Sequence, residues 1–262
     1  MHILVTNDDG INAPGLLFLA RELRKIARVS ILAPDRNWSG GGHVKTLDRP
    51  LRVKEVKLAD GTTGFASDGA PSDCVALALL GYIDTKIDLV VSGINPQPNL
   101  GHDLTYSGTV TAAMESVIWG VHGIAVSLDS PEDTLAEIYY QTAAQVARDV
   151  VKNYSEKGLP PGILLNVNVP RKTYAELNGY QVTRQGLRVY GDRLDQRTDP
   201  RGRDYFWIGG DAPTGVPEQG TDVGALSDGS VSITPVQLDL TSYPTMQNLS
   251  AWRWEKEKSI IP

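Results

Sequence analysis

The chain has 262 residues, and 41% of them are hydrophobic, which is enough for a substantial core in one large or two modest domains. Asp and Glu (31) outnumber Lys and Arg (25), so the net charge is -6. This acidic balance, without a basic stripe, argues against a nucleic-acid partner. A phosphate ligand would therefore need local attraction, from a metal ion or from helix N-termini.

The cysteine content and the apolar segments indicate the compartment. The single cysteine, Cys74, rules out an internal disulfide and favours a reducing cytoplasm, and its apolar surroundings predict a core position. The first apolar stretch ends at Thr6 and is followed by acids, unlike a signal peptide. No segment has the roughly 20 apolar residues of a membrane span. We expect a cytoplasmic protein without a membrane partner.

Apolar strands alternate with amphipathic helices over the first 170 residues. Strand followed by helix and strand implies parallel pairing with right-handed crossovers. We predict an α/β fold, with a doubly wound, mostly parallel, Rossmann-like sheet in three αβα layers, forming a catalytic domain of residues 1–170. The expected strands are residues 2–5, 29–33, 87–91, 124–128 and 162–167, and the expected helices are residues 14–27, 71–80, 108–120 and 133–153.

The pattern changes beyond residue 170. Strands are expected at 180–184 and 204–208, separated by a charged stretch, 188–203, without a core pattern. Such a projecting hairpin is too thin to be stable alone, so we expect it to pack on a partner subunit. A final strand is expected at 229–235. A short helical tail carrying Trp252 and Trp254 should dock on this subunit or a neighbour. We therefore predict that residues 171–262 serve oligomerisation and form no independent domain.

Two adjacent carboxylates, Asp8 and Asp9, stand where the first strand ends. In open α/β sheets, ligands bind beyond the carboxyl ends of the strands. The alternative is a solvated turn, because Asn, Asp and Gly are common turn residues. Polar residues also follow two further expected strands: Ser39, before three glycines, comes after 29–33, and Asn95 comes after 87–91. Glycines allow the backbone to approach a ligand closely.

The segment Ser107-Gly108-Thr109 opens a predicted helix. Ser107 suits the N-cap position, and the free N–H groups of a first helical turn attract anions. Each of these strand and helix ends alone would be an ordinary turn or cap, but their coincidence at one sheet edge favours a ligand site. The oxygen-only donors Asp8, Asp9, Ser39 and Asn95 predict a hard cation such as Mg²⁺, Mn²⁺ or Ca²⁺.

Several motifs together resemble the stationary-phase survival protein family, SurE, of metal-dependent nucleotidases. The resemblance extends over nearly the whole chain. Its motifs are Asn7-Asp8-Asp9-Gly10, Ser39-Gly40, Ser92-Gly93-Ile94-Asn95, Tyr106-Ser107-Gly108-Thr109-Val110, Pro200-Arg201-Gly202-Arg203-Asp204-Tyr205, Trp207-Ile208-Gly209-Gly210, Gly220-Thr221-Asp222-Val223 and Ile233-Thr234-Pro235.

The resemblance implies a phosphatase that acts on nucleoside 5'- and 3'-monophosphates, and in some members on short polyphosphate. It implies one divalent cation per subunit, Mg²⁺ or Mn²⁺, on the oxygen ligands named above. It also implies homodimers or homotetramers, built through an extended hairpin and a swapped C-terminal segment. Its phosphate contacts match Asn12, Ser107, Gly108 and Thr109.

The chain departs from the family pattern at Gln97, where glycine is usual, and at Gly42, where serine is common. We expect altered specificity rather than lost activity. Asp9 is the more suitable of the two aspartates to accept the proton of the attacking water. An aspartyl-phosphate mechanism is disfavoured because enzymes of that kind space their aspartates by one residue. Among the histidines, only His43 lies beside the glycines. A metal and nucleotide-binding module without catalysis is the alternative function.

Overall fold

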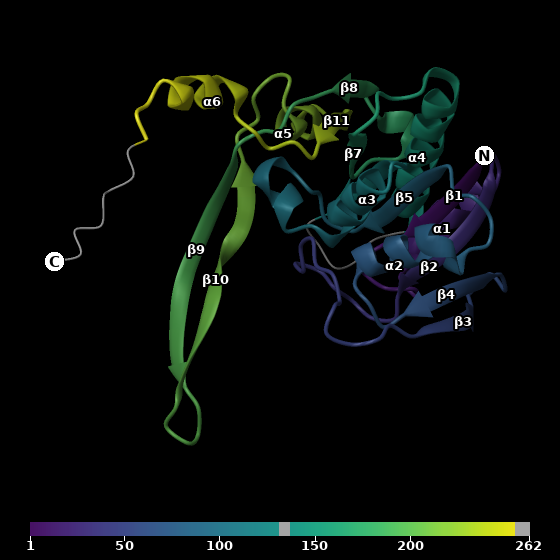
Figure 1. The fold of residues 1–262 in the computed structure, drawn as a ribbon, viewed down its shortest axis with the longest axis horizontal. Helices are drawn as coiled ribbons and strands as arrows, with labels where there is room; N and C mark the ends of the chain where they lie inside the picture. The colour runs from purple at the N-terminus through teal and green to yellow at the C-terminus, as the bar shows by residue number, and fades with distance from the viewer. Residues whose placement is uncertain (131–136, 255–262) are drawn as a thin grey trace.

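The computed structural model describes residues 1–130 and 137–254. At its centre, β1 (His2–Thr6) lies between β2 (Arg28–Pro34) and β5 (Leu89–Asn95), and both pairings are parallel. Every residue of β1 is buried, as expected for an apolar strand covered on both faces. The sheet has nine strands in the order β3-β4-β2-β1-β5-β6-β7-β11-β8 (Figure 1). The remaining strands are β3 (Val53–Lys57), β4 (Thr63–Ser67), β6 (His122–Asp129), β7 (Ile163–Pro170), β8 (Tyr180–Val182) and β11 (Val231–Gln237).

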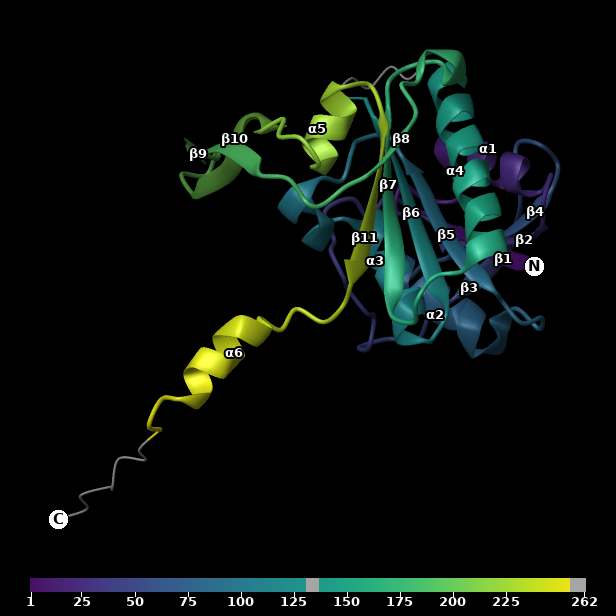
Figure 2. The same ribbon diagram turned by 90° about the horizontal axis from the view of Figure 1, so that it is seen from above.

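Helices cover both faces of this sheet. On one face, α1 (Pro14–Leu23) and α4 (Glu137–Lys157) pack on the largest apolar cluster (Figure 2). On the other face lie α2 (Pro71–Leu77), α3 (Gly108–Ile118) and α5 (Asp222–Ser227). The predicted doubly wound, three-layer α/β fold is therefore confirmed. The described residues contain no helix with the length and apolar character needed to cross a bilayer.

Some element boundaries differ from those expected. The strand expected to end at Val91 continues to Asn95, so Asn95 is the last residue of β5 rather than part of a loop. The helix expected at 71–80 becomes a π-helical turn after Leu77, and Gly81 adopts a φ of 110° there. Helix α4 begins at Glu137 among the described residues, since 133–136 lie outside them, and it runs to Lys157. The sequence predicted no strand at β3 or β4 and no helix at α5.

The chain beyond residue 170 forms an arm and an extended tail. The arm pairs β9 (Arg188–Thr198) with β10 (Asp204–Gly215) in an antiparallel ladder that projects from the body (Figure 1). The charged stretch 188–203 is thus largely strand, contrary to expectation. Strands β8 and β11 join the main sheet, where β11 is antiparallel to β7. The main sheet continues past residue 170. The division of the chain into two functional parts at this residue stays a prediction.

The C-terminal tail leaves the body (Figure 2). Helix α6 (Tyr243–Ser250) has no buried residue. Trp252 and Trp254 follow this helix rather than belonging to it, and they are 61% and 72% exposed. Their rings lie 5.5 Å apart between centroids. Docking of the tail on a neighbouring subunit stays a prediction. Cys74 lies in the core as expected.

The base of the arm is fastened to the segment that leads into α3. Asp222, fully buried, accepts hydrogen bonds from the backbone N–H groups of Gly186 (2.7 Å) and Gly101 (2.8 Å). Gly101 begins a short 3-10 helix, Gly101–Thr105, directly before α3. Within that helix, Asp103 accepts hydrogen bonds from Arg188 Nε (2.7 Å) and the Tyr190 hydroxyl (2.6 Å). These contacts therefore hold the base of the arm against the segment that leads into α3.

We predict that Asp222→Asn lowers the free energy of unfolding by about 2 kcal/mol, because one buried N–H donor would then face an amide nitrogen instead of an oxygen. Urea denaturation at one protein concentration measures the change. The exposed Asp228 is the matched control. Asp228→Asn should change stability by no more than about 0.5 kcal/mol. Equal effects of the two substitutions would contradict the role given to Asp222.

Candidate active site

The predicted site residues gather at the carboxyl edge of the central strands. Because β1 pairs with both β2 and β5, the ends of these three strands are neighbours. Asp8 and Asp9 follow β1, Ser39 follows β2, and Asn95 ends β5. The N-terminus of α3 faces the same edge, since an added Cβ at Gly108 would lie only 2.6 Å from Asp8 Cβ. Glycine is therefore required at position 108.

The turn after β1 is shaped by Asn7. Its side chain accepts a hydrogen bond from the Gly10 N–H (3.2 Å) and donates one to the Gly10 carbonyl (3.0 Å). Gly10 has a φ of 101°, a conformation that residues with a side chain rarely adopt. This closed turn holds Asp8 against α3, where the Thr109 hydroxyl donates a hydrogen bond to Asp8 Oδ1. Asp8 is consequently only 3% exposed.

The two carboxylates occupy an environment that disfavours their charge. Burial raises the pKa of Asp8, although the Thr109 hydroxyl and the backbone of the α3 N-terminus oppose this shift. Burial and the charge of Asp8 raise the pKa of Asp9 to about 7. Asp9 Oδ2 is buried without a hydrogen-bond partner among the described residues. Buried anions of this kind call for a cation, so the pair fits a metal ligand role.

The other two expected ligands lie on segments that the structure places beside this pair. The backbone N–H of Trp38 donates to the Asp8 carbonyl (2.8 Å), which brings the exposed Ser39 close to the turn. Asn95 Nδ2 donates to the Gln97 carbonyl (2.6 Å), so the amide presents Oδ1 as its acceptor. No cluster of three or more His, Cys, Asp or Glu residues suited to a metal occurs in the described part of the chain. The donor set is thus oxygen-based, as hard cations prefer.

The expected phosphate-binding residues have different surroundings. Ser107 is the N-cap of α3, as predicted, and its hydroxyl accepts from the Val110 N–H (3.1 Å). The Thr109 hydroxyl is engaged with Asp8. Asn12 is exposed in the turn before α1, and its contact with a ligand stays a prediction. His43 points to Glu115 on α3, with 2.9 Å between Nε2 and Oε2.

Sequence reasoning missed two polar residues on α3 that contact the loop after β2. They are Thr111, whose hydroxyl lies 3.0 Å from the Gly42 carbonyl, and Glu115. Ser107, Thr111 and Glu115 are spaced four residues apart along α3. Most residues in the first two turns of this helix are buried. A polar stripe at this spacing lies on one helix face, and this signal could have identified them.

Fold and site together define an α/β protein with a candidate hard-cation site at the carboxyl edge of a parallel sheet. The sequence matches the family "Survival protein SurE" over residues 3–192, and the chain belongs to this family. A 5'-nucleotidase SurE from Chloroflexus aggregans is 53% identical over 256 residues, covering 97% of this chain and 100% of the relative. One from Herpetosiphon aurantiacus is 51% identical, covering 97% and 99%.

A solved structure agrees with this assignment. The crystal structure of the SurE protein from Aquifex aeolicus is similar with a TM-score of 0.81 and 41% sequence identity. The similarity covers 95% of this chain and 98% of that one. The resemblance seen in the short sequence motifs is therefore confirmed over nearly the full length of the chain.

We predict that Asp9→Asn stabilises the metal-free protein in alkaline solution. The pKa of Asp9 is raised in the folded state to about 7, so stability is highest below the unfolded-state pKa and falls as the pH rises through the folded-state pKa. Asparagine removes the charge, and Tm should therefore increase by several degrees at about pH 8, with a much smaller increase at about pH 5.

Thermal unfolding of both proteins in EDTA, followed by circular dichroism, measures this difference. Added Mn²⁺ should raise the Tm of the unmodified protein and have little effect on the variant, because a ligand stabilises only the state that binds it. A lower Tm for the metal-free variant at about pH 8 would contradict the repulsion between the two carboxylates.

Proposed function

We propose that the chain is a divalent-metal-dependent 5'-nucleotidase, a phosphoric monoester hydrolase that converts nucleoside monophosphates to nucleoside and phosphate. The observation that carries this proposal is the buried Asp8 and Asp9 pair beside the α3 N-terminus, with Asp9 Oδ2 unpartnered among the described residues. The 5' activity is supported by the two relatives described above, both of which are 5'-nucleotidases. We extend the proposal to 3'-monophosphates and short polyphosphate, as the family resemblance implies.

Asp8, Asp9, Ser39 and Asn95 would hold one divalent cation per subunit, either Mg²⁺ or Mn²⁺. When bound, such a cation polarises the phosphate and makes water more acidic, an effect worth several kcal/mol. The carboxylates supply the charge that attracts it. Ser39 and Asn95 supply neutral oxygens, so the site does not accumulate further negative charge against an anionic substrate.

The substrate phosphate would bind at the α3 N-terminus, through Ser107, Gly108 and Thr109, and would also contact Asn12. The partial positive charge of the helix end favours an anion there and stabilises the charge that develops on the leaving oxygen. Asp8 already lies at this helix end, so a phosphate bound there would be next to the carboxylates. This position compensates locally for the net charge of -6.

Asp9 Oδ2 is the atom that we assign to accept the proton of the attacking water. The atom has no hydrogen-bond partner among the described residues, so it can accept without breaking an existing bond. Asp8, whose Oδ1 accepts from Thr109, is less available for this step.

We propose that the working form is a cytoplasmic homodimer or homotetramer assembled through the arm and the C-terminal segment. Apolar side chains at 206, 207 and 208 on β10 are exposed, as are both tail tryptophans. Exposed apolar surface of this extent commonly marks an interface. The division of the chain into a catalytic domain of residues 1–170 and an oligomerisation segment of residues 171–262 belongs to this proposal.

The proposed activity is tested by phosphate release from AMP and from p-nitrophenyl phosphate. We expect release with Mn²⁺ or Mg²⁺ and none after EDTA, because the site needs a cation to bind the phosphate. Asp9→Asn should reduce turnover by orders of magnitude while the protein remains folded. If the metal-loaded protein binds AMP but releases no phosphate, it is a binding module rather than an enzyme.

A further inference from the structure

The loop after β2, residues 38–47, is fastened at several points. We call this segment the glycine loop. It contacts the turn after β1, the entry to α3 and α3 itself, and near its end Thr46 donates hydrogen bonds to Asp73 on α2. At its start, the Trp38 N–H donates to the Asp8 carbonyl (2.8 Å). At Gly42, the backbone N–H donates to the Tyr106 carbonyl (3.0 Å). The Thr111 hydroxyl donates a hydrogen bond to the Gly42 carbonyl (3.0 Å) and is also within hydrogen-bond distance of the Ser107 carbonyl. Ser39 therefore lies between two attachment points.

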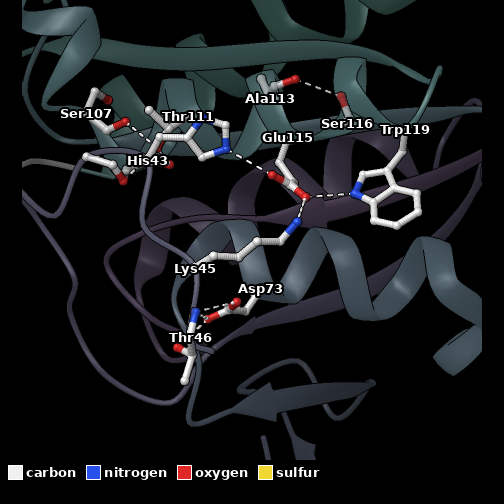
Figure 3. Close-up of polar contacts among 12 residues, drawn as sticks. His43, Lys45, Thr46, Asp73, Ser107, Thr111, Ala113, Glu115, Ser116 and Trp119 are labelled. Carbon is white, nitrogen blue, oxygen red and sulfur yellow. Dashed lines mark hydrogen bonds and ion pairs between the residues drawn. The ribbon is translucent and has the colours of Figure 1, made fainter. Parts of the chain in front are cut away.

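The strongest attachment lies one helical turn beyond Thr111. The carboxylate of Glu115 is the common partner of two side chains from the glycine loop (Figure 3). Lys45 Nζ lies 2.6 Å from Oε1, and His43 Nε2 lies 2.9 Å from Oε2. The Trp119 indole N–H also donates to Oε1 (2.7 Å). Both oxygens of Glu115 are thus engaged, and most of their partners come from the loop.

Glu115 is 1% exposed, so its charge depends on these partners. Burial alone would raise its pKa, but the hydrogen bonds from His43, Lys45 and Trp119 outweigh burial and lower the pKa to about 2. A buried carboxylate without its partners is strongly disfavoured. The ionised Glu115 therefore holds the glycine loop against α3, and loss of the loop contacts would leave the charge without compensation.

We propose that Glu115 is a positioning residue of the candidate active site, which holds the glycine loop through His43 and Lys45 so that Ser39 stays beside Asp8 and Asp9. The inference rests on the proposed function, because it concerns the same metal site. Helix α3 would then position both parts of this site. Its N-terminus contacts Asp8, and its second turn fixes the loop that carries Ser39.

Glu22 provides a matched control on the other face of the sheet. It is 2% exposed, and it contacts Lys25 and Arg148 (2.9 Å), much as Glu115 contacts Lys45 and His43. It lies on α1, away from the glycine loop. Glu22→Gln and Glu115→Gln therefore remove comparable buried charges, and only the second concerns the loop.

The test combines two measurements on the metal-free protein with one on the active enzyme. In Glu115→Gln we expect faster amide hydrogen exchange at residues 38–46 and about tenfold weaker Mn²⁺ binding by calorimetry, the usual effect of removing a residue that orients a metal ligand. With AMP, kcat/KM should fall by a similar factor, and excess Mn²⁺ should recover part of it. Glu22→Gln should leave loop exchange and Mn²⁺ binding unchanged.

Unchanged loop exchange and Mn²⁺ binding in Glu115→Gln would overturn the proposal, as would equal changes in Glu22→Gln. If Glu115→Gln does not fold, variants of Lys45, its partner on the glycine loop, are tested instead. Lys45→Met should weaken Mn²⁺ binding while Lys45→Arg, which keeps the charge, should not. Equal binding by these two variants would also overturn the proposal. Failure of the unmodified protein to hydrolyse AMP would instead reject the proposed function, and the Mn²⁺ measurements would still decide the role of Glu115.

Discussion

The repulsion between Asp8 and Asp9 is the constraint around which the rest of the site is arranged. Adjacent carboxylates at the end of a buried strand cannot both be ionised without compensation. The fold provides part of it, because the α3 N-terminus and Thr109 face Asp8. Asp9 Oδ2, by contrast, has no hydrogen-bond partner among the described residues. In the proposed function this remaining imbalance favours a bound cation, at the expense of the stability of the metal-free protein.

Helix α3 connects the parts of the site that come from distant positions in the chain. Thr109 in its first turn contacts Asp8, Thr111 contacts the backbone at Gly42, and Glu115 contacts His43 and Lys45. One rigid helix thus fixes the strand end and the glycine loop in a single frame. Sites built on rigid elements keep their geometry better than sites built on loops alone.

The sequence predicted the central sheet because fully buried parallel strands are written as continuous apolar runs, as in β1. It missed β3, whose sequence Val-Lys-Glu-Val-Lys is half polar, and β9, whose charged residues pair with β10 rather than with a core. Among the site residues, those at strand and helix ends were predictable from position. The spacing of Glu115 along α3 could have placed it on a polar helix face, but its contacts with His43 and Lys45 were not predictable, because these partners lie 72 and 70 positions away along the chain.

The fastening of the arm at Asp103 and Asp222 has an evolutionary consequence. On the arm, these side-chain contacts reach Gly186, Arg188 and Tyr190, which lie at the base of β9 and just before it. The ladder beyond them is held by its own strand pairing. Insertions, deletions and substitutions toward the tip therefore leave the entry to α3 untouched. In the proposed assembly, selection can change which copies of the protein recognise one another without altering the chemistry, and the two traits can diverge at different rates among relatives.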